Sequence, residues 1–150
     1  MTKRLLAADG IENLRDFGDY DTAAGRRLKP GRLLRSGHLA SATLFDRDRL
    51  SAFRIGTIVD LRRPDERRRQ PSKPPMGFSG AVLVNENDDG REAPHHAFLR
   101  AGDLSEESGR RFMEGVYAEL PFDEGHVDLF RRYFARLAVA DRPVLDRKST

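Results

Sequence analysis

Residues 57–62 read Thr57-Ile58-Val59-Asp60-Leu61-Arg62, a short apolar run with charges toward its carboxyl end. β-branched residues dominate the run and it is too short for a stable helix, so it predicts a buried strand. Pro64 follows, then two acidic and three basic residues up to Arg69, the order typical of a helix start and its dipole. Asp60 and Arg62 therefore lie where a strand gives way to a helix. Ligands of α/β proteins bind at that edge of the sheet, so the stretch predicts a site.

The flanking sequence alternates between predicted strands and helices. Strands are expected at 32–36, 57–61 and 81–84 and from Arg142 onward; helices are expected from Ser41 or Thr43 to Phe53, from Pro64, behind the capping-box-like 103–106, and from Gly125. This alternation predicts an α/β fold with a mostly parallel central sheet flanked by helices. We see no internal repeat and no linker, so residues 1–150 are expected to form a single domain.

Apolar residues in the second half recur at helical spacing. Two stripes are formed, the first by Phe112, Val116 and Leu120 and the second by Val127, Phe130, Phe134 and Leu137. This spacing is typical of core packing rather than of a ligand platform. Leu44, Leu50 and Phe53 are the expected apolar face of the helix that ends near Phe53, with Gly56 as its stop.

Two other segments are expected to be irregular. Residues 19–25 are rich in turn formers and predict a hairpin tip, and residues 85–102 are polar and predict a long loop. His95 and His96 lie in that loop. Adjacent histidines lack the one-face spacing of a metal-binding helix and have no evident third ligand, so a solvated loop is favoured over a metal site.

The composition excludes several classes of site. The 150 residues contain no cysteine, which excludes disulfides, thiolate metal ligands and a thiol nucleophile within them. No apolar run is long enough to span a membrane, and the N-terminus lacks the apolar region of a signal peptide, so a soluble, cytoplasmic protein is expected. The net charge is +3, with the signs interleaved along the chain. That pattern is typical of a solvated surface, and nucleic-acid binding ranks last among the functions considered.

Four segments, taken in order, resemble those of bacterial tyrosine/serine protein phosphatases. The matching segments are Asn13-Leu14-Arg15-Asp16-Phe17-Gly18 with Tyr20, Pro30 to Leu39, Ile58 to Arg62 with Pro64 and Glu66, and the run from Phe112 to Leu145. The resemblance implies a protein-tyrosine-phosphatase-like fold. It also implies hydrolysis of a phosphorylated protein or small phosphomonoester, without a cofactor, a metal, a nucleic acid or a membrane partner.

The chain departs from that family after Leu145. The family continues with His-Cys-x-x-Gly-Lys-Asp-Arg-Thr-Gly, whereas this sequence reads Asp146-Arg147-Lys148-Ser149-Thr150. Such phosphatases attack phosphorus with a thiolate and cradle the phosphate in backbone N–H groups and an Arg. We therefore expect a C-terminally incomplete copy, by truncation, frame change or loss, that is inactive as given. Because helices expected after the loop are also absent, we expect an uncovered apolar face and poor solubility or dimerisation.

Four residues are the expected site. Asp60 is the candidate general acid, with capping of the next turn or pairing with Arg62 as the alternative. Arg15 and Arg62 are expected to orient a phosphate, with structural ion pairs as the alternative, and Arg35 is a third expected substrate-binding residue. Asp16 is expected to be a local backbone partner rather than a catalyst.

Three functions stay open at this point. The first is hydrolysis of phosphotyrosine or phosphoserine by the family route. The second is a catalytically dead phosphate-binding or scaffold protein that retains Arg15, Arg62 and Asp60. The third is a basic nucleic-acid-binding domain.

Overall fold

The computed structural model describes residues 4–86 and 94–148, which contain one mixed, mostly parallel five-stranded sheet. Its strand order is β1-β2-β5-β3-β4. The strands are β1 (Arg15–Asp16), β2 (Leu33–Ser36), β3 (Thr57–Asp60), β4 (Ala81–Val84) and β5 (Val144–Arg147). Only β1 runs antiparallel to its neighbour; β2, β5, β3 and β4 pair in parallel. The predicted parallel sheet is confirmed.

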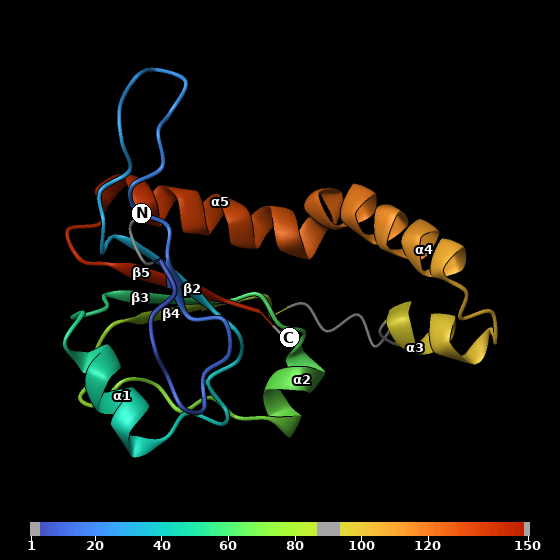
Figure 1. Cartoon of the computed structure of the whole chain (residues 1–150), viewed down its shortest axis with the longest axis horizontal. Helices are drawn as coiled ribbons and strands as arrows, with labels where there is room; N and C mark the ends of the chain where they lie inside the picture. The colour runs from blue at the N-terminus through green and yellow to red at the C-terminus, as the bar shows by residue number, and fades with distance from the viewer. Residues whose placement is uncertain (1–3, 87–93, 149–150) are drawn as a thin grey trace.

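Helices flank the sheet on both sides. They are α1 (Leu44–Ser51), α2 (Pro64–Arg69), α3 (Pro94–Arg100), α4 (Glu106–Glu119) and α5 (Glu124–Val139), with a 3-10 turn η1 (Leu120–Phe122) between the last two. In Figure 1, α1 and α2 lie on one side of the sheet and α5 on the other, while α4 continues outward beyond the sheet and α3 lies beside it. The predicted flanking helices are therefore present.

The central strand β5 divides the core into two clusters. Successive side chains of a strand point to opposite faces. Leu145 accordingly packs with Leu50 and Ile58 on the α1 side, and Val144 packs with Val59 and Leu129 on the α5 side. All four residues of β5 are buried. The last of the predicted strands is thus the middle of the sheet.

A turn beside β1 brings the first segment of the chain against the sheet. The Asp16 carboxylate accepts hydrogen bonds from the backbone N–H of Gly18, at 2.8 Å, and of Gly31, at 2.6 Å. A Cβ on Gly18 would lie 2.3 Å from the Cα of Pro30, so only glycine fits this crossing. The prediction that Asp16 is a backbone partner is confirmed.

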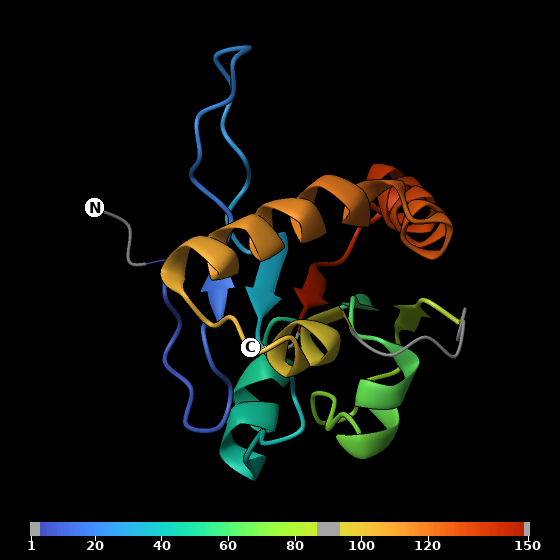
Figure 2. The same ribbon diagram turned by 90° about the vertical axis from the view of Figure 1, so that its right-hand side faces the viewer.

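The predicted hairpin tip is part of an arm that projects from the body (Figures 1 and 2). Its strands are joined by backbone hydrogen bonds between Asp19 and Leu28, Tyr20 and Leu28, and Thr22 and Arg26. The guanidinium of Arg4 lies 3.5 Å from the centre of the Tyr20 ring at the base of this arm. This cation–π contact helps hold the arm on the body.

Several local predictions were wrong. Residues 94–100 of the predicted loop form α3, and His95 and His96 are in that helix. Phe98 of α3 stacks on Phe112 of α4, with ring centroids 4.4 Å apart. The helix is stabilised by this tertiary contact, which local sequence does not reveal.

The predicted apolar faces of the helices also need correction. Leu50 of the predicted face of α1 is buried in the core, but Leu44 is 71% exposed. The helix ends at Ser51, with Ala52 as its C-cap, rather than stopping at Gly56, and Arg54 carries the positive φ. In α5 the fully buried residue is Leu129, outside the predicted stripe, and Phe134 is 65% exposed.

Helix α4 buries none of its residues among those the structure describes, and the side chain of Leu120 lies outside that description. Phe112 of its predicted stripe is half-buried, and Tyr117 is exposed. The stripe therefore faces neighbouring helices and solvent more than a core. The expected poor solubility or dimerisation stays a prediction.

One buried carboxylate joins α1 to the first loop. Asp46 accepts from the backbone N–H of Asp9 and Gly10, both at 2.8 Å, and from the backbone N–H and hydroxyl of Thr43 at 3.0 and 2.9 Å. Thr43 in turn caps the helix by accepting from the Asp46 N–H. Burial alone raises the pKa of Asp46, but these hydrogen bonds outweigh it and lower the pKa to about 2.

Asp46→Asn tests this junction. The folded pKa is below the unfolded value, so the Asp46 contribution is present above about pH 4 and is lost as the pH falls through about 2. We expect the substitution to lower the free energy of unfolding at pH 7 by about 2 kcal/mol and to flatten its decline between about pH 4 and pH 2. Chemical denaturation across that range measures both.

The matched control is Asp48→Asn, an exposed carboxylate on the same helix, which should change stability by less than about 0.5 kcal/mol. If the free energy of unfolding of Asp46→Asn falls with acid as steeply as that of the unsubstituted chain, the stabilising role of the Asp46 carboxylate is contradicted.

Candidate functional site at the carboxyl edge of the sheet

The carboxyl ends of β3 and β5 lie side by side and form the candidate site. Parallel pairing places Asp60 directly opposite Arg147, and the N–H of Leu61 continues the ladder to the Arg147 carbonyl at 3.0 Å. On its other side Arg147 pairs with Ser36 of β2. The strand ends that hold these residues are therefore fixed by backbone hydrogen bonds.

Two buried guanidinium groups hold the Asp60 carboxylate. Arg62 Nε lies 3.0 Å from Oδ1 and Arg62 Nη2 lies 3.1 Å from Oδ2. Arg147 Nη2 lies 2.5 Å from Oδ2, and the N–H of Arg62 adds a bond of 3.2 Å to Oδ1. Asp60 has no exposed surface, and Arg62 and Arg147 are 2% and 3% exposed. The three side chains form one ionic cluster inside the sheet edge.

These hydrogen bonds limit the chemistry that the Asp60 carboxylate can perform in this conformation. A carboxylate has about four lone-pair sites, and four N–H donors occupy those of Asp60. Its oxygens have no exposed surface. The structure contains the ion pair between Asp60 and Arg62, which was the alternative to a catalytic role. The general-acid role of Asp60 stays a prediction.

The other two predicted site residues lie on the opposite face of the sheet. Arg15 and Arg35 are cross-strand partners in β1 and β2. The pleat turns Arg35 and its partner Asp146 toward α5, away from the face of Asp60 and Arg147. The structure therefore brings Asp60 and Arg62 together, and Arg15 and Arg35 together, but it separates the two pairs.

Asp146 is the centre of this second group. Arg35 Nε lies 3.5 Å from its Oδ1, and the Tyr133 hydroxyl of α5 donates to its Oδ2 at 3.3 Å. Burial raises the pKa of Asp146 above its usual range, and the charge of Arg35 partly offsets this. Burial also raises the pKa of Tyr133, with the nearby Asp146 charge adding to the effect.

Sequence reasoning did not identify Asp146, Arg147 or Tyr133 as site residues. The signal for the first two was their place at the end of a predicted strand, after Val144 and Leu145. Nothing in the sequence signalled Tyr133, because its role depends on how α5 crosses the sheet.

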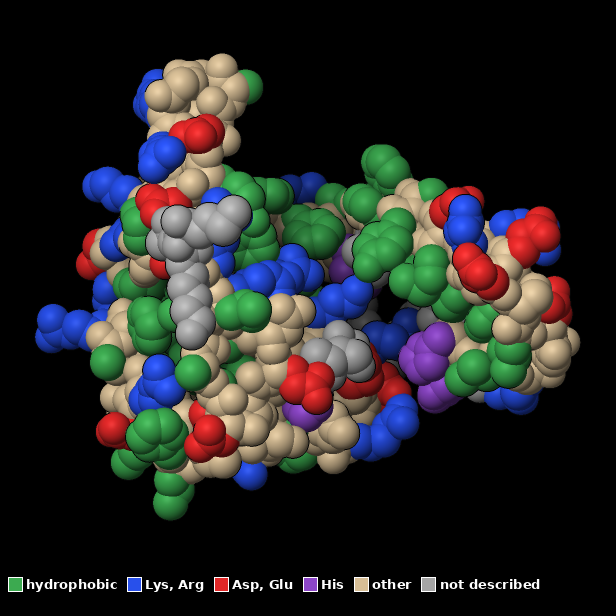
Figure 3. Space-filling view, in the orientation of Figure 1, with side chains coloured by type: hydrophobic (Ala, Val, Ile, Leu, Met, Phe, Trp, Pro, Cys, Tyr) green, Lys and Arg blue, Asp and Glu red, His purple; other side chains and the backbone are tan. Residues whose placement is uncertain are grey.

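Positive charge surrounds the same edge. Arg67 of α2 donates from Nη1 to the carbonyls of Arg62, at 3.1 Å, and Asn85, at 2.8 Å. The Lys148 ammonium lies 5.3 Å from the centre of the Tyr117 ring of α4. Figure 3 shows Lys and Arg side chains gathered beside a recess between the sheet and helices α3 and α4.

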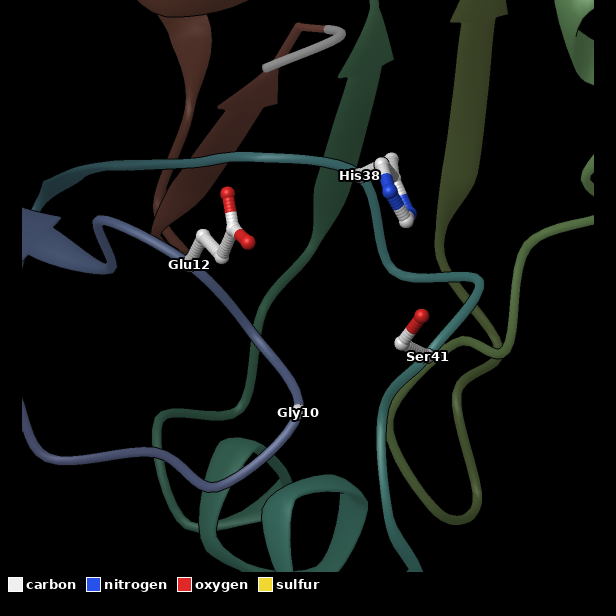
Figure 4. Close-up of a pocket in the computed structure, with 4 residues that line it drawn as sticks. All are labelled: Gly10, Glu12, His38 and Ser41. Atoms are coloured by element: carbon white, nitrogen blue, oxygen red, sulfur yellow. The ribbon is translucent and has the colours of Figure 1, made fainter.

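A separate small pocket lies near the α1 end of the molecule and is lined by Gly10, Glu12, His38 and Ser41 (Figure 4). His38 Nδ1 accepts from the N–H of Ala40 at 3.3 Å, so one ring nitrogen is already engaged. None of the four predicted site residues lines this pocket.

Within residues 4–86 and 94–148 no three His, Asp or Glu side chains are grouped so that they could hold a metal. In the same part of the chain, no helix has the length and apolar character needed to cross a membrane.

Asp60→Asn tests the ionic cluster. The amide cannot neutralise two buried guanidinium groups, so we expect the free energy of unfolding to fall by about 3–5 kcal/mol. Urea denaturation at pH 7 measures it. Asp65→Asn is the control, because Asp65 pairs with Arg69 at a partly exposed position and should cost less than about 1 kcal/mol. Equal losses for the two variants would contradict the buried cluster.

Comparison with known proteins identifies the family of this chain. The sequence profile of the tyrosine phosphatase family matches residues 6–146. A tyrosine-protein phosphatase of Cupriavidus necator is 45% identical over 62 residues, which cover 41% of this chain and 23% of that protein. The triple specificity protein phosphatase PtpB of Mycobacterium tuberculosis is 32% identical over 155 residues, which cover 91% of this chain and 54% of that protein. The chain thus spans about half the length, or less, of these curated relatives. It belongs to the tyrosine phosphatase family.

Proposed function

We propose that these 150 residues form the scaffold of a phosphomonoester-hydrolysing phosphatase and do not by themselves turn over substrate. The observation that supports this is the end of β5. The central strand ends with Asp146 and Arg147, and the 150 residues include no cysteine. Without a thiolate no phosphocysteine can form, which removes the covalent route of cysteine phosphatases.

The proposed substrate class is a phosphorylated protein or a small phosphomonoester. It is supported by the family and by the relatives, which are described as a tyrosine-protein phosphatase and a triple specificity protein phosphatase. Arg15 and Arg35 are the proposed phosphate-facing residues, since the Arg35 side chain keeps 31% of its surface exposed at the sheet edge. A cytoplasmic location belongs to the same proposal.

For Asp60 and Arg62 we infer an anchoring role in this chain. A general acid must reach the leaving oxygen and exchange a proton with it. Asp60 would have to leave Arg62 and Arg147 and become exposed before it could do so. The cost of separating such a buried pair favours anchoring over catalysis.

A p-nitrophenyl phosphate assay on the purified chain tests the proposal. We expect release of p-nitrophenol at the rate of the buffer blank from pH 5 to pH 8, because no thiolate is present. Arg35→Met purified in parallel is the control for a contaminating phosphatase, which would act equally in both preparations. Turnover that exceeds the blank and falls in Arg35→Met would contradict the proposal.

A further inference from the structure

Positive charge gathers at the amino-terminal edge of the sheet, at the opposite end of the strands from the candidate site. Four segments meet there, residues 28–34, 51–57, 78–81 and 135–143, around the starts of β2, β3, β4 and β5. They contain five basic residues and one acid, Asp141, so their net charge of +4 exceeds the +3 of the whole chain. We call this region the amino-edge surface, and its basic residues are Lys29, Arg32, Arg54, Arg136 and Arg142.

Hydrogen bonds join three of these arginines into one continuous surface. Arg32 donates from its two Nη atoms to the carbonyls of residues 140 and 141, in the turn between α5 and β5 at the left of Figure 1. Arg142 of the same turn donates from Nε and Nη2 to the carbonyls of residues 54 and 55, at 2.9 and 3.1 Å. Arg136 Nε donates to the hydroxyl at the start of β3 at 3.1 Å. The orientation of each guanidinium group is therefore fixed before any partner binds.

These contacts leave most of the donors and all of the charge available. A guanidinium group carries five N–H groups. Arg32 and Arg142 each use two of them, and Arg136 uses one. Within residues 4–86 and 94–148 none of the three forms an ion pair with a carboxylate. The carbonyl contacts account for the position of these arginines but do not neutralise them. Figure 3 shows Lys and Arg side chains projecting at the left of the molecule.

Arg54 is the member of the surface that the fold does not require. Its side chain is exposed and makes no hydrogen bond or ion pair with the part of the chain that the structure describes. Its φ of 52° lies in the left-handed region, where glycine is favoured over residues with a Cβ. Neither packing nor backbone conformation therefore accounts for an arginine at this position.

The neighbouring side chains indicate what kind of polyanion fits. Val139 and Leu28, 74% and 36% exposed, are the large apolar residues that the four segments expose. The rings of Phe53 and Phe78 pack against the α1-side core, so they offer no platform for stacking nucleic-acid bases. Two modest aliphatic side chains also lack the aromatic and leucine-rich face with which proteins enter a lipid surface. Carboxylates of another protein match the exposed guanidinium groups.

We propose that the amino-edge surface binds an extended acidic segment of a partner protein, with Asp and Glu side chains on the arginines and an apolar side chain on Val139. Alternate side chains of an extended segment point to one side, so several carboxylates can face neighbouring guanidinium groups. The surface lies one strand length from Asp60 and Arg62, at the other end of β3. Its occupation therefore depends neither on turnover nor on the proposed function.

Fluorescence anisotropy of a labelled peptide tests the surface. The probe is a heptapeptide of Asp and Glu with leucine at its centre, and the matched peptide has Asn and Gln in place of the acids. We expect saturable binding of the acidic peptide to the full chain, weakened by added salt, and none of the amide peptide. Equal binding of the two peptides, or tighter binding of an oligothymidylate or of phosphatidylserine vesicles at the same ionic strength, would overturn the proposal.

Arg54→Gly is the informative variant, because glycine suits the positive φ and only the exposed side chain is removed. We expect unchanged or higher stability in urea denaturation and about two- to fivefold weaker binding of the acidic peptide. Arg69→Met removes the same charge from an exposed position on α2, so it should bind as tightly as the unsubstituted chain. Undiminished binding by Arg54→Gly, or an equal loss in Arg69→Met, would contradict the surface.

Lys29→Met repeats the test without altering the backbone at Arg54. Its side chain is exposed at the base of the arm, so the variant should fold as the unsubstituted chain does and bind the acidic peptide about two- to fivefold more weakly. Combined with Arg54→Gly it should weaken binding further, because the two charges lie in separate segments. A double variant that binds as tightly as the unsubstituted chain would overturn the proposal.

Discussion

The pairing of Asp60 with Arg62 and Arg147 controls the carboxyl edge of this sheet. Asp60 ends β3 and Arg147 ends β5, and both lie where a parallel sheet would present a ligand. Their side chains instead turn inward and form an ion pair beneath the surface. The backbone ladder and the ionic cluster reinforce each other, because the register that pairs the two strands also sets the distance between the charges.

The same register decides which side chains these residues place at the end of the central strand. The chain belongs to the tyrosine phosphatase family. Its scaffold consists of the five-stranded sheet and the two core clusters, one on the α1 side and one on the α5 side. The reactive part of such an enzyme is a thiolate and its phosphate-binding loop. At the end of β5 these residues offer a carboxylate on one face and a guanidinium on the other.

The sequence predicted β2, β3, β4 and β5 but not β1, together with the mostly parallel sheet and four of the helices, since those depend on local periodicity and caps such as Thr43 with Asp46. It failed where tertiary contacts decide: α3 is held by stacking of Phe98 on Phe112. At the site, sequence order could place Asp60 and Arg62 together because they are two residues apart. It could not show that Arg15 and Arg35 face the other side of the sheet, nor that Arg147 reaches Asp60, because both facts depend on strand register.

A double-mutant cycle between Asp60→Asn and Arg147→Met tests most directly whether the two charges hold the edge as one unit. The account predicts that the double variant loses less stability than the two single losses added together, by at least about 1 kcal/mol. Single losses that simply add would show that the residues act independently and would contradict the account.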